Sequence, residues 1–332
     1  MNRELTEPQA APVLVYDRIS SNKRTTWLMM VGFVVIFTAL LGVIGIAAGM
    51  PIGILGVVGI GLIVYALVSY WISTNVVLSI SGAHEVTKEE EWEFVRRVEN
   101  LAIGSGLPMP RTWVLEDSAP NAFATGRDPK HASMAVTTGL LQKLDREQLQ
   151  GVIGHEMSHI GNLDIRFTLL VGVLVGSIAL LADWFLRFTF WGGGRRSSSD
   201  SDRGGGGAQA IIFIVAIVLA VLAPLIGRLV QAAVSRSRES LADASAVELT
   251  RNPVGLARAL RAISDDQEVL EVANRATQHL YIVNPIKSFE ERAKSLWDTH
   301  PPIGERIRAL ENIAGQMGVL SPAGSDPTST AR

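Results

Sequence analysis

Long apolar runs dominate the first quarter of the chain. The runs 26–48 and 52–73 follow a polar tail over residues 1–25, and neither contains Asp, Glu, Lys or Arg. As helices rising about 1.5 Å per residue, each would be roughly 33 Å long, enough to cross a hydrocarbon core about 30 Å thick. The pattern therefore predicts a transmembrane hairpin over residues 26–73.

Two more apolar runs lie in the second half of the chain, at 167–182 and 208–227. A Gly/Ser/Arg-rich segment, 192–207, separates them and has the composition of a flexible linker. We predict a second transmembrane hairpin over 166–230. The run 167–182 is short for a span, and a re-entrant or interfacial segment is the alternative there.

Basic residues predict how these hairpins are oriented. The turn 49–51 has no Lys or Arg, whereas the tail before the first hairpin carries Arg3, Arg18, Lys23 and Arg24. Because cytoplasmic loops are enriched in Lys and Arg, we expect the tail and residues 74–165 to face the cytoplasm. The second hairpin's connection carries Arg187, Arg195, Arg196 and Arg203, which argues against placing that connection outside.

The polar segments 74–165 and 231–317 have the patterns of a folded domain divided by the second hairpin. Helical spacing of apolar residues and helix-start signals predict helices within 85–107, over Arg146 to Ile160, and within 235–250, 253–266 and 299–318. Strand-forming composition marks 111–117 and 132–141, and 120–126 is a candidate third strand. The tail 318–332 has the composition of a disordered segment.

One helix start is predicted in detail. Asp145 and Gln148 have the spacing of a capping box, in which two side chains satisfy the free backbone N–H groups of the first turn. The helix that follows, to about Ile160, carries most of the candidate chemistry.

Composition narrows the function. The chain has 332 residues, 48% of them hydrophobic, a net charge of −2 and no cysteine. The small net charge and the absence of a basic and aromatic cluster argue against nucleic acid as a partner. Without cysteine there is no disulfide, thiol nucleophile or thiolate ligand, so His, Asp or Glu must hold any metal.

The stretch GHEMSHIGNLD, from Gly154, contains His155, Glu156 and His159. On a helix, residues four apart share a face, so the two imidazoles can bind one ion while the carboxylate reaches a water beside it. This is the HExxH pattern of zinc peptidases, with two ligands and a general base. A helix face with two solvated histidines is the alternative, and the apolar flanking residues argue against it.

A catalytic zinc needs a third protein ligand. Glu239 is the candidate, on a predicted helix, with Asp243 one turn later as a partner that could orient a zinc-bound histidine. Spacing alone supports equally well an exposed face on which both acids pair with Arg236 and Arg238. If Glu239 and His159 bind one ion, the chain between them must cross the membrane twice or not at all.

The chain resembles the HtpX family of membrane-bound heat-shock zinc metallopeptidases. The resemblance rests on the motifs NAFATG, GHEMSHIGNLD, SRSRESLADASA and THPPIGERIRAL, in this order and with apolar runs before and between them. It implies an α-rich α+β fold: a multi-span helical membrane protein whose gluzincin-type catalytic domain, with HExxH plus a downstream Glu, carries a small β-sheet. It also implies one Zn²⁺ per chain, bound by His155, His159 and Glu239, with Glu156 as the base.

The same resemblance implies further site residues. Asp243 would be the partner of the first histidine. Asn121, Ala122, Phe123 and Ala124 would form an edge strand that pairs with an extended substrate. His300 and Arg306 match positions near the active site in related peptidases, and His300 would donate to the oxyanion. A turn residue that caps the last helix is the alternative for His300.

The function implied by the resemblance is cleavage of misfolded or surplus membrane proteins at the cytoplasmic face of the inner cell membrane, as part of a stress response. Lipid and unfolded polypeptide are the expected partners, and the oligomeric state stays open. Three alternatives remain: a CAAX prenyl endopeptidase, a non-catalytic metal-binding scaffold, and a channel or transporter. Uncharged spans argue against the last, and Glu156 argues against the scaffold.

Overall fold

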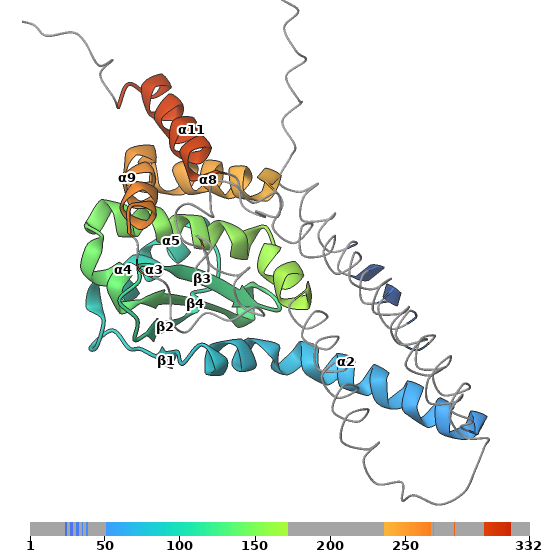
Figure 1. Ribbon diagram of the computed structural model, residues 1–332. Coiled ribbons are helices and arrows are strands. Elements are labelled where there is room, and N and C mark those ends of the chain that lie inside the picture. Colours follow the sequence, from blue (N-terminus) through green and yellow to red (C-terminus); the bar gives the residue numbers. More distant parts are fainter. Residues whose placement is uncertain are drawn as a thin grey trace, which may run out of the picture.

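The computed structural model describes residues 51–171, 236–266 and 302–319, together with positions 24, 27, 28, 31, 32, 35, 38, 268 and 282. Its helices and strands form a folded domain from which one long helix extends (Figure 1). Several predicted segments lie outside the described residues: most of the run 26–48, the run 208–227, the linker 192–207, both chain ends and His300.

The centre of the domain is a mixed four-stranded sheet in the order β1-β2-β4-β3. Strand β2 (Arg111–Leu115) runs parallel to β4 (Ala132–Thr137), while β1 (His84–Glu85) and β3 (Ala122–Gly126) are antiparallel to their neighbours. Strand β3 is therefore at one edge of the sheet.

Helices cover one face of this sheet. Helix α3 (Trp92–Ser105) and helix α5 (Arg146–Gly161) contribute Val98, Val152 and Met157 to a core that also contains Met134 and Val136 of β4. Helices α8 (Arg236–Thr250), α9 (Pro253–Ser264) and α11 (Ile303–Gln316) pack beyond α5, on its far side from the sheet (Figure 1). The sheet thus supports α5, and α5 supports the C-terminal helices.

Close helix packing depends on glycines in α5. A Cβ atom on Gly151 would lie 2.7 Å from the backbone nitrogen of Leu256 in α9, and one on Gly255 would lie 2.7 Å from the carbonyl oxygen of Glu147. Any side chain at either position would separate the two backbones. These glycines fix how closely α5 and α9, which are far apart in the chain, approach each other.

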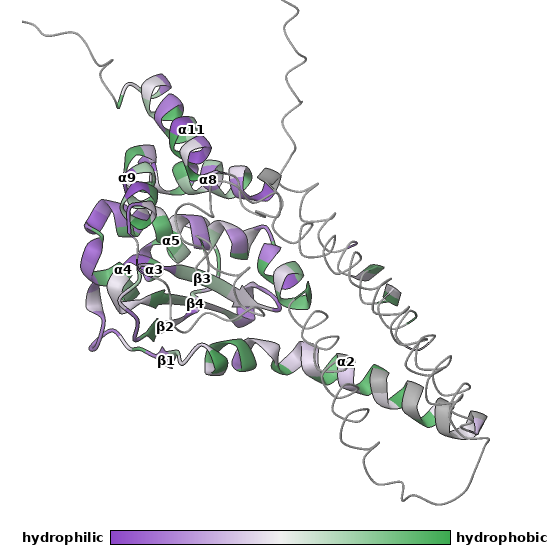
Figure 2. Ribbon diagram, viewed as in Figure 1, coloured by the Kyte–Doolittle hydropathy of each residue, from purple (hydrophilic) through white to green (hydrophobic). Residues whose placement is uncertain are grey.

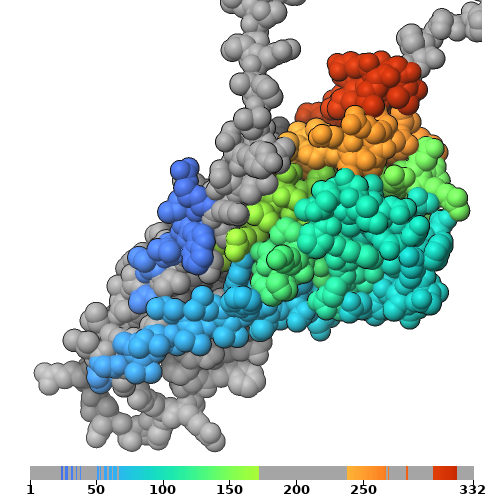
Figure 3. Space-filling model, turned by 180° about the vertical axis from the view of Figure 1, so that it is seen from behind, coloured from blue at the N-terminus to red at the C-terminus, as the bar shows by residue number. Residues whose placement is uncertain are grey.

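Helix α2 (Ile52–Ile80) is longer than the apolar run 52–73 that predicted it. One side of its last turns packs on the other face of the sheet, where Leu78 contacts Leu115 and Phe123. Its earlier turns extend away from the domain (Figure 3) and consist mostly of apolar residues (Figure 2), several of which are exposed. Among the described residues, one stretch is long and apolar enough to cross a membrane: Ile63–Ile80, which is 24% buried.

The other sequence expectations are mostly confirmed. Helices α3, α5, α8, α9 and α11 lie where spacing and capping signals predicted them, and 120–126 contains a strand. The strand expected over 132–141 is too long, because the Thr137 side chain accepts from the Leu140 N–H and begins helix α4 (Thr138–Lys143). Strand β1 was not anticipated, since two residues carry no periodic signal.

Candidate active site

Helix α5 begins as its sequence predicts. The Asp145 carboxylate accepts from the backbone N–H groups of Glu147 and Gln148, each at 2.9 Å, and the Gln148 side chain accepts from the Asp145 N–H. This complete capping box sets where the helix starts, and so which residues of the motif face the same way.

The two histidines of the motif converge on one point. His155 and His159 lie one turn apart on α5, with ring centroids 4.7 Å apart and nearly perpendicular planes. Their Nε2 atoms are separated by 3.2 Å. His155 is buried and His159 is partly exposed, so the second imidazole is the one nearer solvent.

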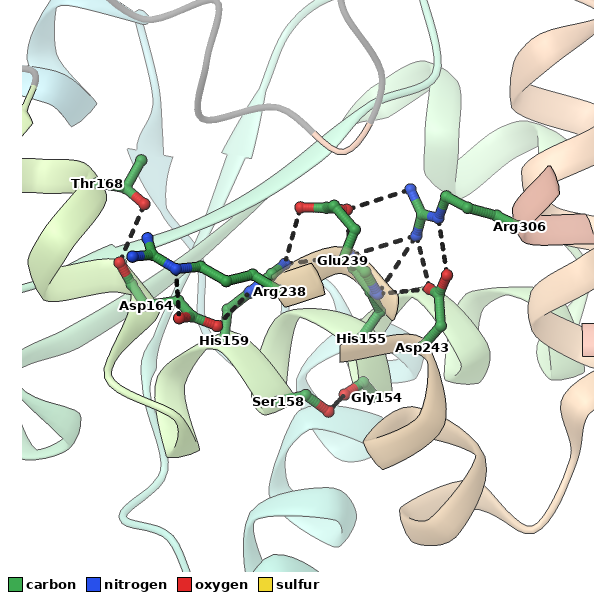
Figure 4. Close-up of polar contacts among 10 residues, drawn as sticks. All are labelled: Gly154, His155, Ser158, His159, Asp164, Thr168, Arg238, Glu239, Asp243 and Arg306. Carbon is green, nitrogen blue, oxygen red and sulfur yellow. Dashed lines mark hydrogen bonds and ion pairs between the residues drawn. The ribbon is translucent and has the colours of Figure 1, made fainter. Parts of the chain in front are cut away.

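Glu239 joins this pair from the first turn of α8. One carboxylate oxygen lies 3.5 Å from His155 Nε2 and the other lies 3.7 Å from His159 Nε2 (Figure 4). The ligand atoms of the three residues all lie within 4.8 Å of one another. Tertiary packing therefore brings together a cluster whose members are far apart in the chain.

These separations fit a tetrahedral metal ion. With ligand bonds of about 2.0–2.2 Å, two ligands of a tetrahedral zinc are about 3.3 Å apart. The observed separations of 3.2, 3.5 and 3.7 Å are close to that value. Two imidazoles and one carboxylate leave a fourth direction for water or substrate, as in catalytic rather than structural zinc sites.

The exposed-face alternative for the two acids is wrong. Glu239 and Asp243 are only 5% and 6% exposed. Arg238 points elsewhere: its guanidinium lies 3.6 Å from the Asp164 carboxylate and stacks 3.9 Å from the Phe167 ring. The alanine-rich face of α8 is buried against α5. The spacing of charged residues along the sequence of α8 does not show whether that face is buried or exposed.

Asp243 and Arg306 surround the outer nitrogen of His155. The Asp243 carboxylate lies 2.9 Å from His155 Nδ1 and accepts two bonds from Arg306, at 2.7 and 2.8 Å. Arg306 Nη1 also lies 3.3 Å from Glu239. The guanidinium is 3% exposed, so one buried cation offsets two buried carboxylates (Figure 4).

This network controls protonation. Burial would raise the pKa of Asp243, but the Arg306 charge and its hydrogen bonds lower that pKa to about 2. Burial and the Arg306 charge both disfavour a charged His155, yet hydrogen bonds to Asp243 and Glu239 outweigh them and raise the pKa of His155 to about 9. Asp243 is therefore a permanent anion facing the outer nitrogen of His155.

Asp164 has the corresponding position beside the second histidine, and sequence reasoning missed it. Its carboxylate lies 3.1 Å from His159 Nδ1. Helix α5 ends at Gly161, and a turn at Leu163 with a positive φ of 60° directs the chain back toward the histidine. The aspartate of GNLD, five residues after His159, was the available signal.

Glu156 lies next to the cluster but outside it. It is 3% exposed, and burial raises the pKa of its carboxyl, although the neighbouring imidazoles and a hydrogen bond from the Ala124 backbone act in the opposite direction. A raised pKa brings a carboxylate closer to the working range of a general base. The hydrogen bond also links the helix of the motif to edge strand β3.

The segment Asn121 to Ala124 includes the first part of that edge. The Thr137 N–H donates to the Asn121 carbonyl at 3.0 Å, so by antiparallel alternation Ala122 and Ala124 direct their backbone groups away from β4. The Ala122 carbonyl accepts from the Ile282 N–H at 3.0 Å. The Phe123 side chain lies on the face of the sheet opposite to α5, where it packs with Leu78 of α2.

Comparisons with known proteins agree with this geometry. The profile of peptidase family M48 matches residues 88–314. A "Protease HtpX homolog" from Listeria monocytogenes is 45% identical over 309 residues, covering 90% of this chain and all of the relative. Proteins with the same description from Ligilactobacillus salivarius and Streptococcus gordonii are 45% and 41% identical, again over 90% of this chain.

Among solved structures, the crystal structure of S. mikatae Ste24p aligns with a TM-score of 0.48 and 16% identity, over 90% of this chain and 66% of that one.

The HExxH helix, the distant glutamate and the family match together define a metallopeptidase. The chain belongs to peptidase family M48, and to the HtpX proteases within it. It is therefore a hydrolase that acts on polypeptides, which favours the peptidase hypothesis over a channel, a transporter or a metal scaffold.

Proposed function

We propose that this protein is a membrane-anchored, zinc-dependent endopeptidase that cleaves misfolded or surplus membrane proteins on the cytoplasmic side of the inner membrane. One observation carries the proposal: the ligand atoms of His155, His159 and Glu239 lie within 4.8 Å of one another, at separations suited to zinc. Zinc is favoured over harder ions because two of the three ligands are imidazoles.

Each residue of the site then has a defined task. His155, His159 and Glu239 hold the ion, with Asp243 and Asp164 fixing the outer nitrogens of the two histidines. A zinc ion held by these residues would supply Lewis-acid polarisation of the substrate carbonyl and acidification of a water. Glu156 accepts a proton from that water on its carboxylate and passes it to the leaving amine. Its burial keeps competing solvent away from the carboxylate.

Substrate binding falls to edge strand β3. An extended peptide beside β3 would form a backbone hydrogen bond with the outward carbonyl of Ala124, whose N–H donates to Glu156. This placement would bring the scissile carbonyl near the metal cluster. Asn121 to Phe123 would contact the neighbouring part of the substrate with groups other than the Asn121 and Ala122 carbonyls, which bond Thr137 and Ile282. His300 would donate to the oxyanion.

Membrane anchoring is supported by α2. Its described turns before residue 70 expose large apolar side chains around the helix, with Val57 70% exposed and Val64 53% exposed. A helix that is apolar on all sides belongs in lipid or in a large core. We infer that the hairpins 26–73 and 166–230 anchor a peptidase domain built from 74–165 and 231–317. The lysines and arginines before residue 25 support a cytoplasmic domain.

The test is a pair of isosteric variants of the full-length protein. Wild type, Glu156→Gln and Glu147→Gln are purified in detergent, depleted of metal with chelator and supplied with zinc, and casein cleavage is followed. Glu147 is an exposed glutamate in the first turn of the same helix. Wild type and Glu147→Gln should cleave casein only with zinc. Glu156→Gln should cleave casein at least 100-fold more slowly, because a general base contributes about 10²–10⁴-fold to the rate. Cleavage by Glu156→Gln at the wild-type rate would refute its role.

The CAAX prenyl endopeptidase hypothesis predicts a different substrate. It requires cleavage of a short prenylated C-terminal peptide in preference to an unfolded polypeptide. Comparing casein with a farnesylated CAAX peptide in the same assay separates the two activities.

A further inference from the structure

Four basic residues gather at one end of the sheet. Arg111 begins β2, Arg127 follows β3, and Lys130 lies in the turn before β4. The register pairs Arg111 with Ser133 and Ser133 with Thr125, so these residues share one end of the sheet. Arg166 follows α5 in the chain, and its side chain contacts helix α2. We call Arg111, Arg127, Lys130 and Arg166 the basic cluster.

Three members of the basic cluster meet α2 within six residues of its sequence. Arg166 Nε donates to the Tyr70 hydroxyl at 2.8 Å. The Arg127 guanidinium stacks 4.4 Å from the Trp71 ring. Arg111 Nη2 lies 3.4 Å from the Asn75 side-chain oxygen. Arginines from three separate segments therefore surround one level of the helix.

At that level one side of the helix becomes covered. Before it, α2 exposes apolar side chains; after it, Ser73, Thr74 and Leu78 are 5%, 8% and 1% exposed, while Val76 and Ile80 stay exposed on the other side. A helix from Ile52 to Trp71 is about 30 Å long, which equals the thickness of a hydrocarbon core. The alternative stretch Ile63–Ile80 also has the length and composition of a span, but its last turns pack on the sheet.

The aromatic residues at this level suit the membrane surface. Trp71 is 58% exposed, and Tyr70 is 7% exposed with its hydroxyl bonded to Arg166. Tyr and Trp are enriched where spans meet the headgroups. A bilayer placed with Trp71 at its surface puts the basic cluster at the depth of the lipid phosphates.

Charge at this end of the sheet stays positive after its acids are counted. Asp128 lies 3.7 Å from Arg127, and Glu85 lies 3.8 Å from Arg111. Within the described part of the chain, Arg166 and Lys130 have no carboxylate within ion-pair distance. Four cations and two carboxylates leave this end of the sheet with a net positive charge that can attract an external anion.

We propose that the basic cluster binds the phosphate groups of acidic phospholipids and so holds the peptidase domain against the membrane. The inference rests on the proposed spanning of α2. It has a consequence for the site, because Arg166 is two residues after Asp164, which contacts His159. Lipid contact would keep the metal site close above the bilayer, within reach of segments that emerge from it.

Lipid binding tests the proposal directly. The full-length protein in detergent is titrated with phosphatidylglycerol or phosphatidylcholine, and bound lipids are counted by native mass spectrometry. Arg127→Gln with Lys130→Gln should weaken phosphatidylglycerol binding at least tenfold, since each surface cation contributes about fivefold. Arg258→Gln with Arg308→Gln removes the same charge from exposed positions on α9 and α11 and should bind as wild type does.

Several outcomes would overturn the inference: equal binding of both lipids by wild type, equal losses in both double variants, or displacement of the lipid by millimolar inorganic phosphate. If Arg127→Gln with Lys130→Gln does not fold, the exposed single substitution Lys130→Glu must show the selective loss instead. Zinc-dependent casein cleavage by wild type in detergent separates the two proposals. Its absence would count against the proposed function, whereas cleavage without lipid selectivity would count only against the basic cluster.

Discussion

His159 Nδ1 lies 3.1 Å from the Asp164 carboxylate, so a residue just beyond the motif helix orients the more exposed imidazole of the metal cluster. An oriented histidine presents its Nε2 to the ion without losing rotational entropy on binding, and the carboxylate makes it a better ligand. Each histidine of the cluster has such a partner, since Asp243 lies 2.9 Å from His155 Nδ1.

Asp164→Asn should lower zinc affinity about 10–100-fold, because loss of an outer hydrogen-bond partner typically has that effect. Zinc titration of chelator-treated protein against a fluorescent competitor measures the change. Asp128→Asn is the matched control, since Asp128 pairs with His131 away from the cluster. Identical zinc affinities in wild type and Asp164→Asn would show that the contact does not tune the ligand.

Arg306→Leu should destabilise the protein strongly, because it leaves Asp243 and Glu239 buried without their shared cation. Removing one partner of a buried ion pair costs about 3–5 kcal/mol. Thermal unfolding in detergent should show a large fall in Tm, whereas Arg308→Leu, an exposed substitution on the same helix, should change Tm little. A comparable Tm for both variants would mean that the buried network contributes little to stability.

Gly151→Ala should separate α5 from α9. The new Cβ would lie 2.7 Å from a backbone atom of Leu256, and forced overpacking costs about 1–3 kcal/mol. Gly315→Ala on α11 meets nothing within 4 Å and should be neutral or slightly stabilising, since Ala has the higher helix propensity. Gly151→Ala should therefore lower Tm, whereas Gly315→Ala should leave Tm unchanged or raise it slightly. An unchanged Tm for Gly151→Ala would contradict the close packing of α5 and α9.

Zinc affinity and the stability of the metal-free protein should respond to pH in opposite ways. The folded state raises the pKa of His155 from 6.5 to about 9. Protonated His155 therefore stabilises the metal-free fold below about pH 6.5, and this contribution disappears as pH rises to about 9. Zinc requires the neutral imidazole, so its affinity should rise over the same interval.

Thermal unfolding of chelator-treated protein and zinc titrations at pH 6.5, 7.5 and 8.5 would check both slopes. Asp243→Asn removes a group that raises this pKa and should flatten the pH dependence of unfolding. A zinc affinity that does not change between pH 6.5 and 8.5 would show that His155 is already neutral in the metal-free protein.

Local signals predicted most of the framework. Capping and spacing located α5, and composition located β2, β4, α8 and α9, because these elements are set by interactions within a few residues. The prediction failed at Thr137, where a side chain that suits a strand also caps the next helix. It also placed the end of α2 too early, because the polar residues Ser73 and Thr74 after Ile72 are buried rather than exposed to solvent.

The sequence by itself determined the chemistry: one pair of histidines at helical spacing, a carboxylate between them, no thiol ligand, and apolar runs long enough to cross a membrane. Only the tertiary structure decided which acids and cations surround that pair. Glu239, Asp243 and Arg306 come from helices far along the chain, and Asp164 reaches His159 through a single turn at Leu163. Such contacts depend on how helices pack and on which charges are buried together, and neither is encoded in local spacing.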